Sequence, residues 1–414
     1  MLLRPDTFAL TATLAMMTSL GPLSMDMYLA SLPDIERLMS ATTADVQLTI
    51  SIYLIGFAIA QIFYGPFSDR YGRRPVLLFA LAVFTLASLA CAAAPSIDVL
   101  IAARFVQSLG GAGAAVIARA IVRDLYVGAR AGRELSLMGA VMALAPIIAP
   151  AFGGLLHIAF GWQSNFLLVV VAGFAIAAVV WKLLPETLAR PVSEPISLVS
   201  IVRGFGGFLA DNRYLAYLGI LACSYAGLFA WISGAAFVLQ RIYAMDPFEF
   251  GVAFGVSCAG YLVGTLIAAK LVMRSGIGLT IGVGVLAQAL GGLFMVLAVA
   301  LGWSSAVWIL LAIALYLAGL GFTGPQAMAG ALTPFPDRAG AASSLFGFVQ
   351  QSWSAVVGAA VGHLLGNSAW PMAGAIAVMG AASLVIWAMM RNPVQRGHRF
   401  QRKADINPVI ADSR

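Results

Sequence analysis

The chain has 414 residues, of which 61% are hydrophobic and only 10% are charged, and its formal net charge is +7. A soluble domain of this length needs far more polar residues to cover its surface, so the composition excludes an ordinary soluble protein. The charge-free stretches are long and recur along the whole chain, which predicts a polytopic membrane protein. Nucleic acid is not expected as a partner, because the basic residues fall in the short loops between these stretches.

The apolar stretches are long enough to be membrane-spanning helices, each of which needs about 20 residues to cross about 30 Å of hydrocarbon. Twelve spans are predicted, at residues 8–30, 45–65, 76–94, 99–119, 134–157, 163–184, 214–240, 248–271, 278–301, 305–329, 340–363 and 369–390. The predicted fold is all-α, with two pseudo-symmetric six-helix halves at 1–184 and 214–390. A polar, Pro-rich cytoplasmic linker loop at 185–213 separates the halves, and a cytoplasmic tail follows at 391–414.

The basic residues fall almost entirely on one side of the predicted spans. Of the 24 Lys and Arg residues, 21 lie at the N-terminus, in alternate loops or in the tail, whereas Arg37 and Arg241 lie on the opposite side and Arg104 lies within a span. Loops rich in Lys and Arg stay in the cytoplasm. We therefore expect a protein of the inner (plasma) membrane with both termini in the cytoplasm.

A weak internal repeat supports the division into halves. The stretch RAGRELSLMG, from Arg130, is similar to RAGAASSLFG, from Arg338, and Trp162 and Trp370 are separated by the same 208 residues. Two similar halves in the same orientation predict a pseudo-two-fold axis along the membrane normal, which is an arrangement found in transporters.

The predicted spans contain one clear acid, Asp26 in the first, and one clear base, Arg104 in the fourth. At 1.5 Å per residue, Asp26 lies about 27 Å along the first helix and Arg104 about 7–8 Å below the outer edge of the fourth. Both then fall in the outer third of the membrane. Loss of water favours a neutral carboxyl group, and a guanidinium favours a charged one. We predict that Asp26 exchanges a proton while Arg104 holds it ionised or binds a polar substrate group. The alternative is that both side chains extend to the outer interface as anchors.

The first cytoplasmic loop contains the stretch GPFSDRYGRRP. Its glycines permit close packing or a positive φ, and its aspartate can pair with an arginine at a helix end where the two halves meet. The alternative is a basic loop that only fixes the topology. The candidate residues of this loop motif are Gly65, Asp69, Arg70, Gly72, Arg73 and Arg74.

The fifth predicted span contains the stretch APIIAPAFGG. Pro146 and Pro150 remove helical hydrogen bonds and can bend the helix, and Gly153 and Gly154 allow a neighbouring backbone to approach. A bent helix packed on a partner can prevent proton leakage. Ordinary packing of a membrane helix is the alternative, because Pro and Gly are common in such helices.

The substrate site is expected near the membrane midplane between the halves, where aromatic side chains would suit flat, apolar compounds. The alternative for each aromatic residue is contact with lipid or with another helix. The candidate residues are Tyr53, Phe57, Gln61, Tyr225, Phe229, Trp231 and Trp353.

Several of these stretches together resemble the major facilitator superfamily and its Bcr/CflA drug-efflux branch. GPFSDRYGRRP resembles the superfamily's loop 2–3 signature, and RFVQSLGGAGAAVIARAIVRDLY resembles its fourth-helix motif. APAFGGLL resembles the fifth-helix motif of its antiporters, although Ala149 stands where Gly is usual before Pro150. DMYLASLP resembles the first-helix signature of the Bcr/CflA branch, with Ala30 in place of the usual Pro.

This resemblance implies a monomeric transporter that exports drug-like small molecules, such as bicyclomycin or phenicols, in exchange for protons. A native metabolite is an equally good substrate, and a proton-coupled uptake permease and an uncoupled uniporter remain alternatives. A membrane enzyme is not expected, because no cluster of His, Asp or Glu lies near one membrane face. Neither a cofactor nor a metal is expected, since the three cysteines have no metal-ligand spacing.

Overall fold

The computed structural model describes residues 7–126, 128–188, 205–335, 338–366 and 368–406. The first half of the chain forms seven α-helices and one 3₁₀-helix: α1 (Phe8–Asp26), η1 (Met27–Ser31), α2 (Leu32–Leu38), α3 (Thr43–Tyr71), α4 (Arg73–Ala92), α5 (Ile97–Leu125), α6 (Gly128–Phe160) and α7 (Gln163–Leu183). The second half forms α9 (Asn212–Phe237), the π-helix η2 (Val238–Ile242), α10 (Pro247–Ala300), α11 (Val307–Leu332), α12 (Ala339–Leu364) and α13 (Trp370–Ile406).

In the described part of the chain, ten helices are long and apolar enough to cross a membrane. One of them, the 54-residue α10, contains a non-helical residue at Gly276, where φ is 76°, so it supplies two spans. The 26-residue α12 is less apolar but long enough to cross. Counted in this way, the predicted architecture of twelve spans in two halves is confirmed.

Three boundaries differ from the sequence prediction. The first span is not one α-helix, because α1 ends at Asp26 and continues as the 3₁₀-helix η1. The predicted linker loop contains a short helical stretch at residues 205–209, and α13 extends through the predicted tail as far as Ile406. Side-chain hydrogen bonds fix two outer helix starts, since Thr42 with Asp45 and Asp246 with Glu249 form capping boxes on α3 and α10.

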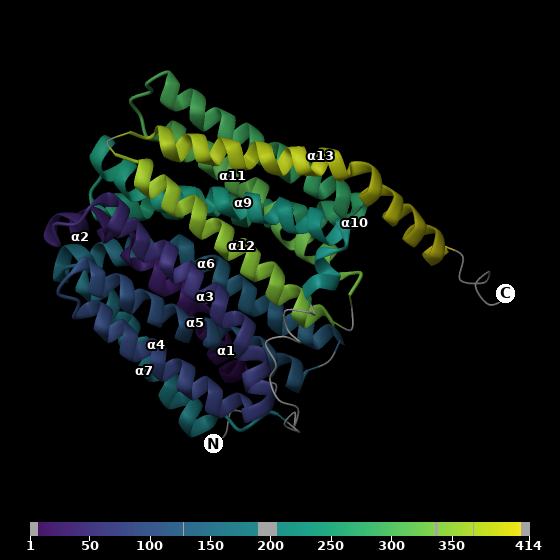
Figure 1. Cartoon of the computed structure of the whole chain (residues 1–414), viewed down its shortest axis with the longest axis horizontal. Coiled ribbons are helices and arrows are strands. Elements are labelled where there is room, and N and C mark those ends of the chain that lie inside the picture. Colours follow the sequence, from purple (N-terminus) through teal and green to yellow (C-terminus); the bar gives the residue numbers. More distant parts are fainter. Residues whose placement is uncertain (1–6, 127, 189–204, 336–337, 367, 407–414) are drawn as a thin grey trace.

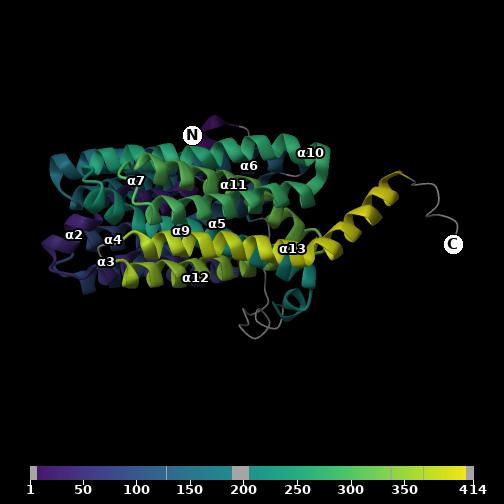
Figure 2. The same ribbon diagram turned by 90° about the horizontal axis from the view of Figure 1, so that it is seen from above.

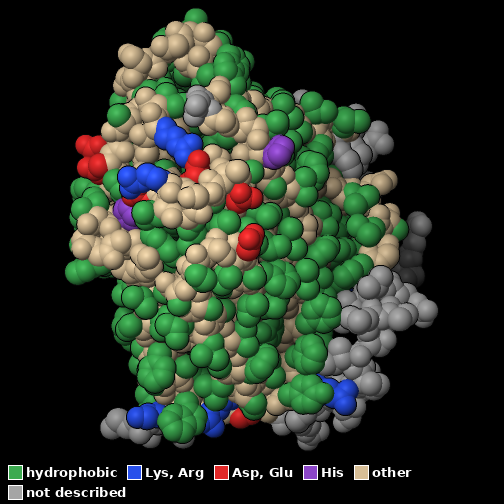
Figure 3. Space-filling model, turned by 60° about the vertical axis from the view of Figure 1, so that its left-hand side comes forward, with side chains coloured by type: hydrophobic (Ala, Val, Ile, Leu, Met, Phe, Trp, Pro, Cys, Tyr) green, Lys and Arg blue, Asp and Glu red, His purple; other side chains and the backbone are tan. Residues whose placement is uncertain are grey.

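The two halves lie side by side. In Figure 1 the helices α1 to α7 occupy the lower part of the bundle, and α9 to α13 the upper part. Figure 2 shows the helices running along one common direction. The halves meet where α3 packs on α12 and α6 packs on α10. A broad band of hydrophobic side chains separates the charged groups at opposite ends of the visible face (Figure 3), as expected for a protein surrounded by lipid.

Candidate functional site

Asp26 lies at the end of α1, where the helix changes from α to 3₁₀. Pro22, one turn earlier, cannot donate the hydrogen bond that would continue the α-helical ladder. The Asp26 side chain is buried, with 5% exposure. In the described part of the chain its carboxylate makes no hydrogen bond or ion pair, and the segment that follows it, η1, packs against α9 and α10 of the second half. The carboxylate therefore lies at the boundary between the halves and has no counter-ion there.

Arg104, the predicted partner, is fully buried on α5 but does not pair with Asp26. Its guanidinium lies against two tyrosine rings, 4.5 Å from the centroid of Tyr28 and 4.3 Å from that of Tyr53. One nitrogen donates to the Ser24 carbonyl oxygen at 3.1 Å and to Gln107 Oε1 at 2.6 Å. Cation–π contacts and these oxygen acceptors compensate the positive charge of Arg104. The predicted pairing with the Asp26 carboxylate, which rested on the similar depth of the two residues, is not present in this structure.

The Arg104 guanidinium is held in a fixed orientation by a chain of polar contacts. Gln107, which accepts from Arg104, donates through Nε2 to Ser88 Oγ on α4 at 2.7 Å. Ser24 in turn donates to the Tyr53 hydroxyl at 3.1 Å. Nε and Nη2 of Arg104 have no hydrogen-bond partner in the described part of the chain. These two donors can take an acceptor that arrives when the halves move, such as the Asp26 carboxylate or a polar group of a substrate.

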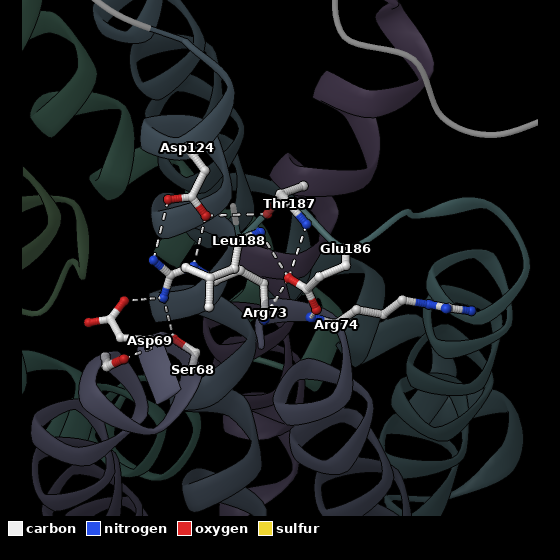
Figure 4. Close-up of polar contacts among 9 residues, drawn as sticks. Ser68, Asp69, Arg73, Arg74, Asp124, Glu186, Thr187 and Leu188 are labelled. Atoms are coloured by element: carbon white, nitrogen blue, oxygen red, sulfur yellow. Dashed lines mark hydrogen bonds and ion pairs between the residues drawn. The ribbon is translucent and has the colours of Figure 1, made fainter. Parts of the chain in front are cut away.

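The loop motif forms a charge network at the opposite end of the bundle (Figure 4). Arg73 lies at its centre: its guanidinium pairs with Asp69 at 2.5 Å and with Asp124 of α5 at 2.8 Å, and it donates to Ser68 Oγ at 2.7 Å. Neither Asp124 nor Ser68 belonged to the predicted set. The network joins the ends of α3, α4 and α5 into one rigid unit within the first half.

Glu186, just beyond α7, binds the N-terminus of α4. Its carboxylate accepts from the backbone N–H groups of Arg73 at 2.9 Å and Arg74 at 3.0 Å, as Figure 4 shows. Gly72 has a φ of 97°, and a Cβ there would lie 2.7 Å from the same carboxylate. A glycine is therefore required at this position both by the backbone conformation and by the space. Gly65, in contrast, has open space around it, and the Arg70 guanidinium lies over the Tyr71 ring.

The predicted fifth-helix motif lies in α6, directly against the second half. A Cβ on Gly153 would collide with the carbonyl group of Met27, the residue after Asp26. A Cβ on Gly154 would collide with the carbonyl of Pro247, at the start of α10. Adjacent glycines thus bring α6 into contact with both the Asp26 segment and the other half. Pro146 is partly buried in the same helix, and Ala149 and Pro150 are buried.

The contact continues on the α10 side. A Cβ on Gly251 would meet Pro150 and Ala151, and a Cβ on Gly255 would meet the Ile147 carbonyl. Backbone atoms therefore face backbone atoms along the whole outer part of this contact. The sequence indicated the α6 glycines, but nothing in it identified Gly251 and Gly255 as the facing residues.

Three polar contacts also join the halves at the end of the bundle where α3 and α10 begin, which the predicted topology places outside and which is called the outer end. Gln240 donates to the Ala30 carbonyl at 2.9 Å, and Arg241 pairs with Glu36. Both residues lie in the π-helix η2, and π-helices are frequent at functional positions. Gln47 of α3 donates to the Ser233 carbonyl of α9. Together with the α6–α10 contact, they hold the outer ends of the halves together.

The predicted cavity residues do not share one surface. Tyr53 is buried against Arg104, and Phe57 stacks on Tyr53 with ring centroids 6.4 Å apart. Phe229 is buried and Tyr225 is partly buried on α9. Gln61 lies opposite Gly347 across the α3–α12 contact, and its Nε2 has no partner.

The two tryptophans among these candidates occupy other environments. Trp231 is fully buried and stacks on Phe254, with ring centroids 6.1 Å apart. Trp353 is 41% exposed and belongs, by helical spacing, to one exposed apolar stripe with Val356 and Leu364. Such a stripe is typical of a lipid-facing surface. The structure therefore assigns Trp231 to helix packing and Trp353 to the lipid-facing surface rather than to a common cavity.

Two helical halves packed side by side in one bundle are the architecture of many secondary transporters. Comparison with known proteins agrees: the model of the Major Facilitator Superfamily matches residues 14–359. The chain belongs to this family, whose members are transporters and not enzymes.

Individual relatives and solved structures cover most of the chain. The uncharacterized MFS-type transporter YdgK of Bacillus subtilis is 36% identical over 267 residues, which are 64% of this chain and 66% of YdgK. The bicyclomycin resistance protein homolog of Haemophilus influenzae is 29% identical over 383 residues, 92% of this chain and 94% of that protein. The nucleoside transporter NupG has the same fold, with a TM-score of 0.73 at 12% identity over 92% of this chain and 99% of NupG.

Proposed function

We propose that the protein exports drug-like small molecules across the inner membrane of a bacterium in exchange for protons, working as a monomer with both termini in the cytoplasm. Relatives named for multidrug and bicyclomycin resistance support a drug as the exported compound. The observation that carries the proposal is the buried Asp26 carboxylate, which lies between the halves and has no counter-ion among the described residues. An ionisable residue of this kind inside a membrane bundle is a candidate for proton transfer.

The geometry links this carboxylate to the contact between the halves. Met27 follows Asp26 directly, and its carbonyl lies against Gly153. Gly154, the next residue, lies against α10 of the other half. A change in the charge of Asp26 that shifts the α1–η1 junction is therefore transmitted through α6 to the outer closing contact.

The exchange cycle follows from these contacts. With the outer ends closed, substrate enters from the cytoplasmic side. Separation of the outer contacts gives Asp26 access to protons from outside and releases the substrate there. The protonated, neutral carboxyl group is compatible with renewed burial, and closure then carries the proton inward.

Asp26→Asn tests the coupling. The amide is nearly isosteric but cannot exchange a proton, so we expect normal insertion and folding but loss of proton-driven transport. Inside-out vesicles carrying a pH gradient and radiolabelled chloramphenicol or bicyclomycin provide the measurement. Asp98→Asn, a substitution of an exposed acid at the start of α5, is the matched control and should transport like the wild type.

Undiminished gradient-driven accumulation by the Asp26→Asn variant would contradict the coupling. The same vesicles separate the alternatives. An uptake permease would empty the vesicles of substrate, and a uniporter would respond to neither an uncoupler nor the gradient.

A further inference from the structure

Arg119 of α5 occupies an unusual position for a basic residue near a membrane surface. It follows Ala112 by seven residues and Ser108 by eleven, so helical geometry places all three on one face of α5. Ser108 and Ala112 are fully buried, and a Cβ on Gly56 of α3 would collide with the Ser108 hydroxyl. This face therefore points into the protein. Arg119 continues this face and its side chain is exposed, so it lies where the face that packs on the other helices reaches water.

Arg119 has no acidic partner among the described residues. The acids at this end of the bundle are engaged elsewhere: Asp69 and Asp124 bind Arg73, and Glu134 accepts a hydrogen bond from Thr11 at 2.6 Å. The nearest charged residue along this face of α5 is another cation, Arg123, one helical turn further on. Two guanidinium groups therefore follow each other on one side of α5 without a counter-ion among the described residues.

Arg123 brings this positive charge to the second half. One of its guanidinium nitrogens would lie 3.8 Å from a Cβ on Gly340, in the first turn of α12. The N-cap of α12 is Arg338, whose side chain makes no capping hydrogen bond. A helix N-terminus carries partial positive charge and free N–H donors, so it adds to the field of the two arginines.

An interior location sets these arginines apart from residues that only orient the protein. Topology requires basic residues at the cytoplasmic interface, and a side chain directed toward lipid headgroups satisfies that requirement. It does not require two unpaired guanidinium groups on the face that α5 presents to the other helices. A guanidinium offers fixed, paired N–H donors that match a carboxylate or phosphate.

We propose that Arg119, Arg123 and the start of α12 form an anion-binding site on the cytoplasmic side of the transport path, which selects substrates that carry an acidic group. This proposal depends on the proposed function in one respect only, namely that the anion bound at the site is a transported substrate. It favours carboxylates, sulfonates and phosphates over neutral compounds of the same shape. It disfavours lipophilic cations, which two arginines repel.

Binding of three matched probes to the purified full-length protein tests the site: 2-naphthoate, the neutral 2-naphthamide and (2-naphthyl)methylammonium. The protein is held in phosphatidylcholine nanodiscs, and ligand-induced shifts in thermal unfolding are titrated. Wild-type protein should bind the carboxylate at least about tenfold more tightly than the ammonium probe. Arg119→Gln and Arg123→Gln should each weaken carboxylate binding about tenfold or more and leave naphthamide binding unchanged.

Two further variants make the test specific. Lys182→Gln removes an exposed basic residue at the end of α7 and should change nothing. Arg119→Lys keeps the charge but loses the paired donors, so its affinity for the carboxylate should fall between those of the wild type and Arg119→Gln. If Arg119→Gln does not fold, Arg119→Lys and Arg123→Gln still decide the question.

Equal wild-type affinities for the carboxylate and the ammonium probe would overturn the proposal, as would unchanged carboxylate binding in the arginine variants. Loss of naphthoate binding when the nanodiscs contain phosphatidylglycerol in place of phosphatidylcholine would show that the site binds a lipid headgroup. That result would overturn the assignment of the site to a substrate. Binding needs no proton gradient. A result in favour of the anion site therefore stands even if Asp26→Asn shows that transport is not driven by protons.

Discussion

At the scale of single residues, the two charges inside the bundle are compensated in different ways. Arg104 is fully buried, but two tyrosine rings and two oxygen acceptors surround its guanidinium. Asp26 has no such partners among the described residues. A stabilised cation can remain charged throughout a transport cycle, whereas an unstabilised carboxylate is the group whose charge can change. The structure therefore separates a fixed charge from a variable one.

Tyr53 provides a test of how Arg104 is stabilised. Tyr53→Leu removes the ring 4.3 Å from the guanidinium and should lower the thermal stability of the detergent-solubilised protein, since a desolvated cation–π contact contributes about 2 kcal/mol. Tyr53→Phe keeps the ring and removes only the hydroxyl, so it should lose clearly less. Equal destabilisation by the two variants would assign the effect to the hydrogen bond with Ser24 instead.

At the scale of helices, the outer closing contact depends on glycines in two facing elements. Gly153 and Gly154 of α6 and Gly251 and Gly255 of α10 allow backbone atoms to meet directly. In a membrane, such close packing replaces the hydrophobic effect as the source of helix association. The distance between the two backbones leaves no room for a side chain larger than that of glycine. The contact is therefore either fully closed or lost, as a two-state transporter requires.

Gly255→Ala should disrupt this contact, because the new methyl group meets the Ile147 carbonyl. Gly139→Ala, in α6 itself, is the matched control, since a Cβ there has open space around it. Alanine favours a helix over glycine by about 1 kcal/mol, so the control should be neutral or slightly stabilising.

Thermal unfolding and labelling of an outer-end cysteine would report both effects. We expect lower stability and greater outer accessibility in Gly255→Ala only. The same behaviour in both variants would show that the space around Gly255 does not control closure.

At the scale of the whole molecule, polar contacts supplement the glycine contact at the outer end. Gln240, Arg241 and Gln47 each bind the opposite half. Near the opposite end, the charge network of Arg73 remains within the first half, and Arg119 and Arg123 of α5 have no acidic partner among the described residues. These polar contacts between the halves therefore lie at one end of the bundle.

A disulfide across the outer end tests whether these contacts must open. A Cβ on Gly362 would lie 2.3 Å from the Gln47 Cβ, so α3 and α12 must separate by about 1–2 Å before Gln47→Cys and Gly362→Cys can form a disulfide under oxidation. Cys91, Cys223 and Cys258 are replaced by serine in this background. We expect transport to stop on oxidation and to return on reduction, with the reduced double variant and the oxidised single variants as the references. Full transport by completely cross-linked protein would contradict opening at this end.

Much of the fold could be predicted because its signals are local. Twelve apolar segments follow from the thickness of the bilayer, and the family follows from short motifs whose residues are contiguous. The break at Asp26 was not predicted, because Pro22 and the residues after it are compatible with a continuous kinked helix. Gly276, at which α10 changes direction, falls in the short loop predicted between the spans at 248–271 and 278–301.

The sequence by itself determined which residues are exceptional: one acid and one base within otherwise apolar spans. Only the tertiary structure decided what they contact. Helical rise fixes the depth of Asp26 and Arg104, but rotation about each helix axis and the packing of neighbours fix their direction. Tyrosines from η1 and α3 therefore took the place beside Arg104 that a carboxylate had been expected to fill. In the same way, the sequence shows Arg119 only as one of 21 basic residues on the predicted cytoplasmic side. The buried residues on the same face of α5 distinguish it from the others.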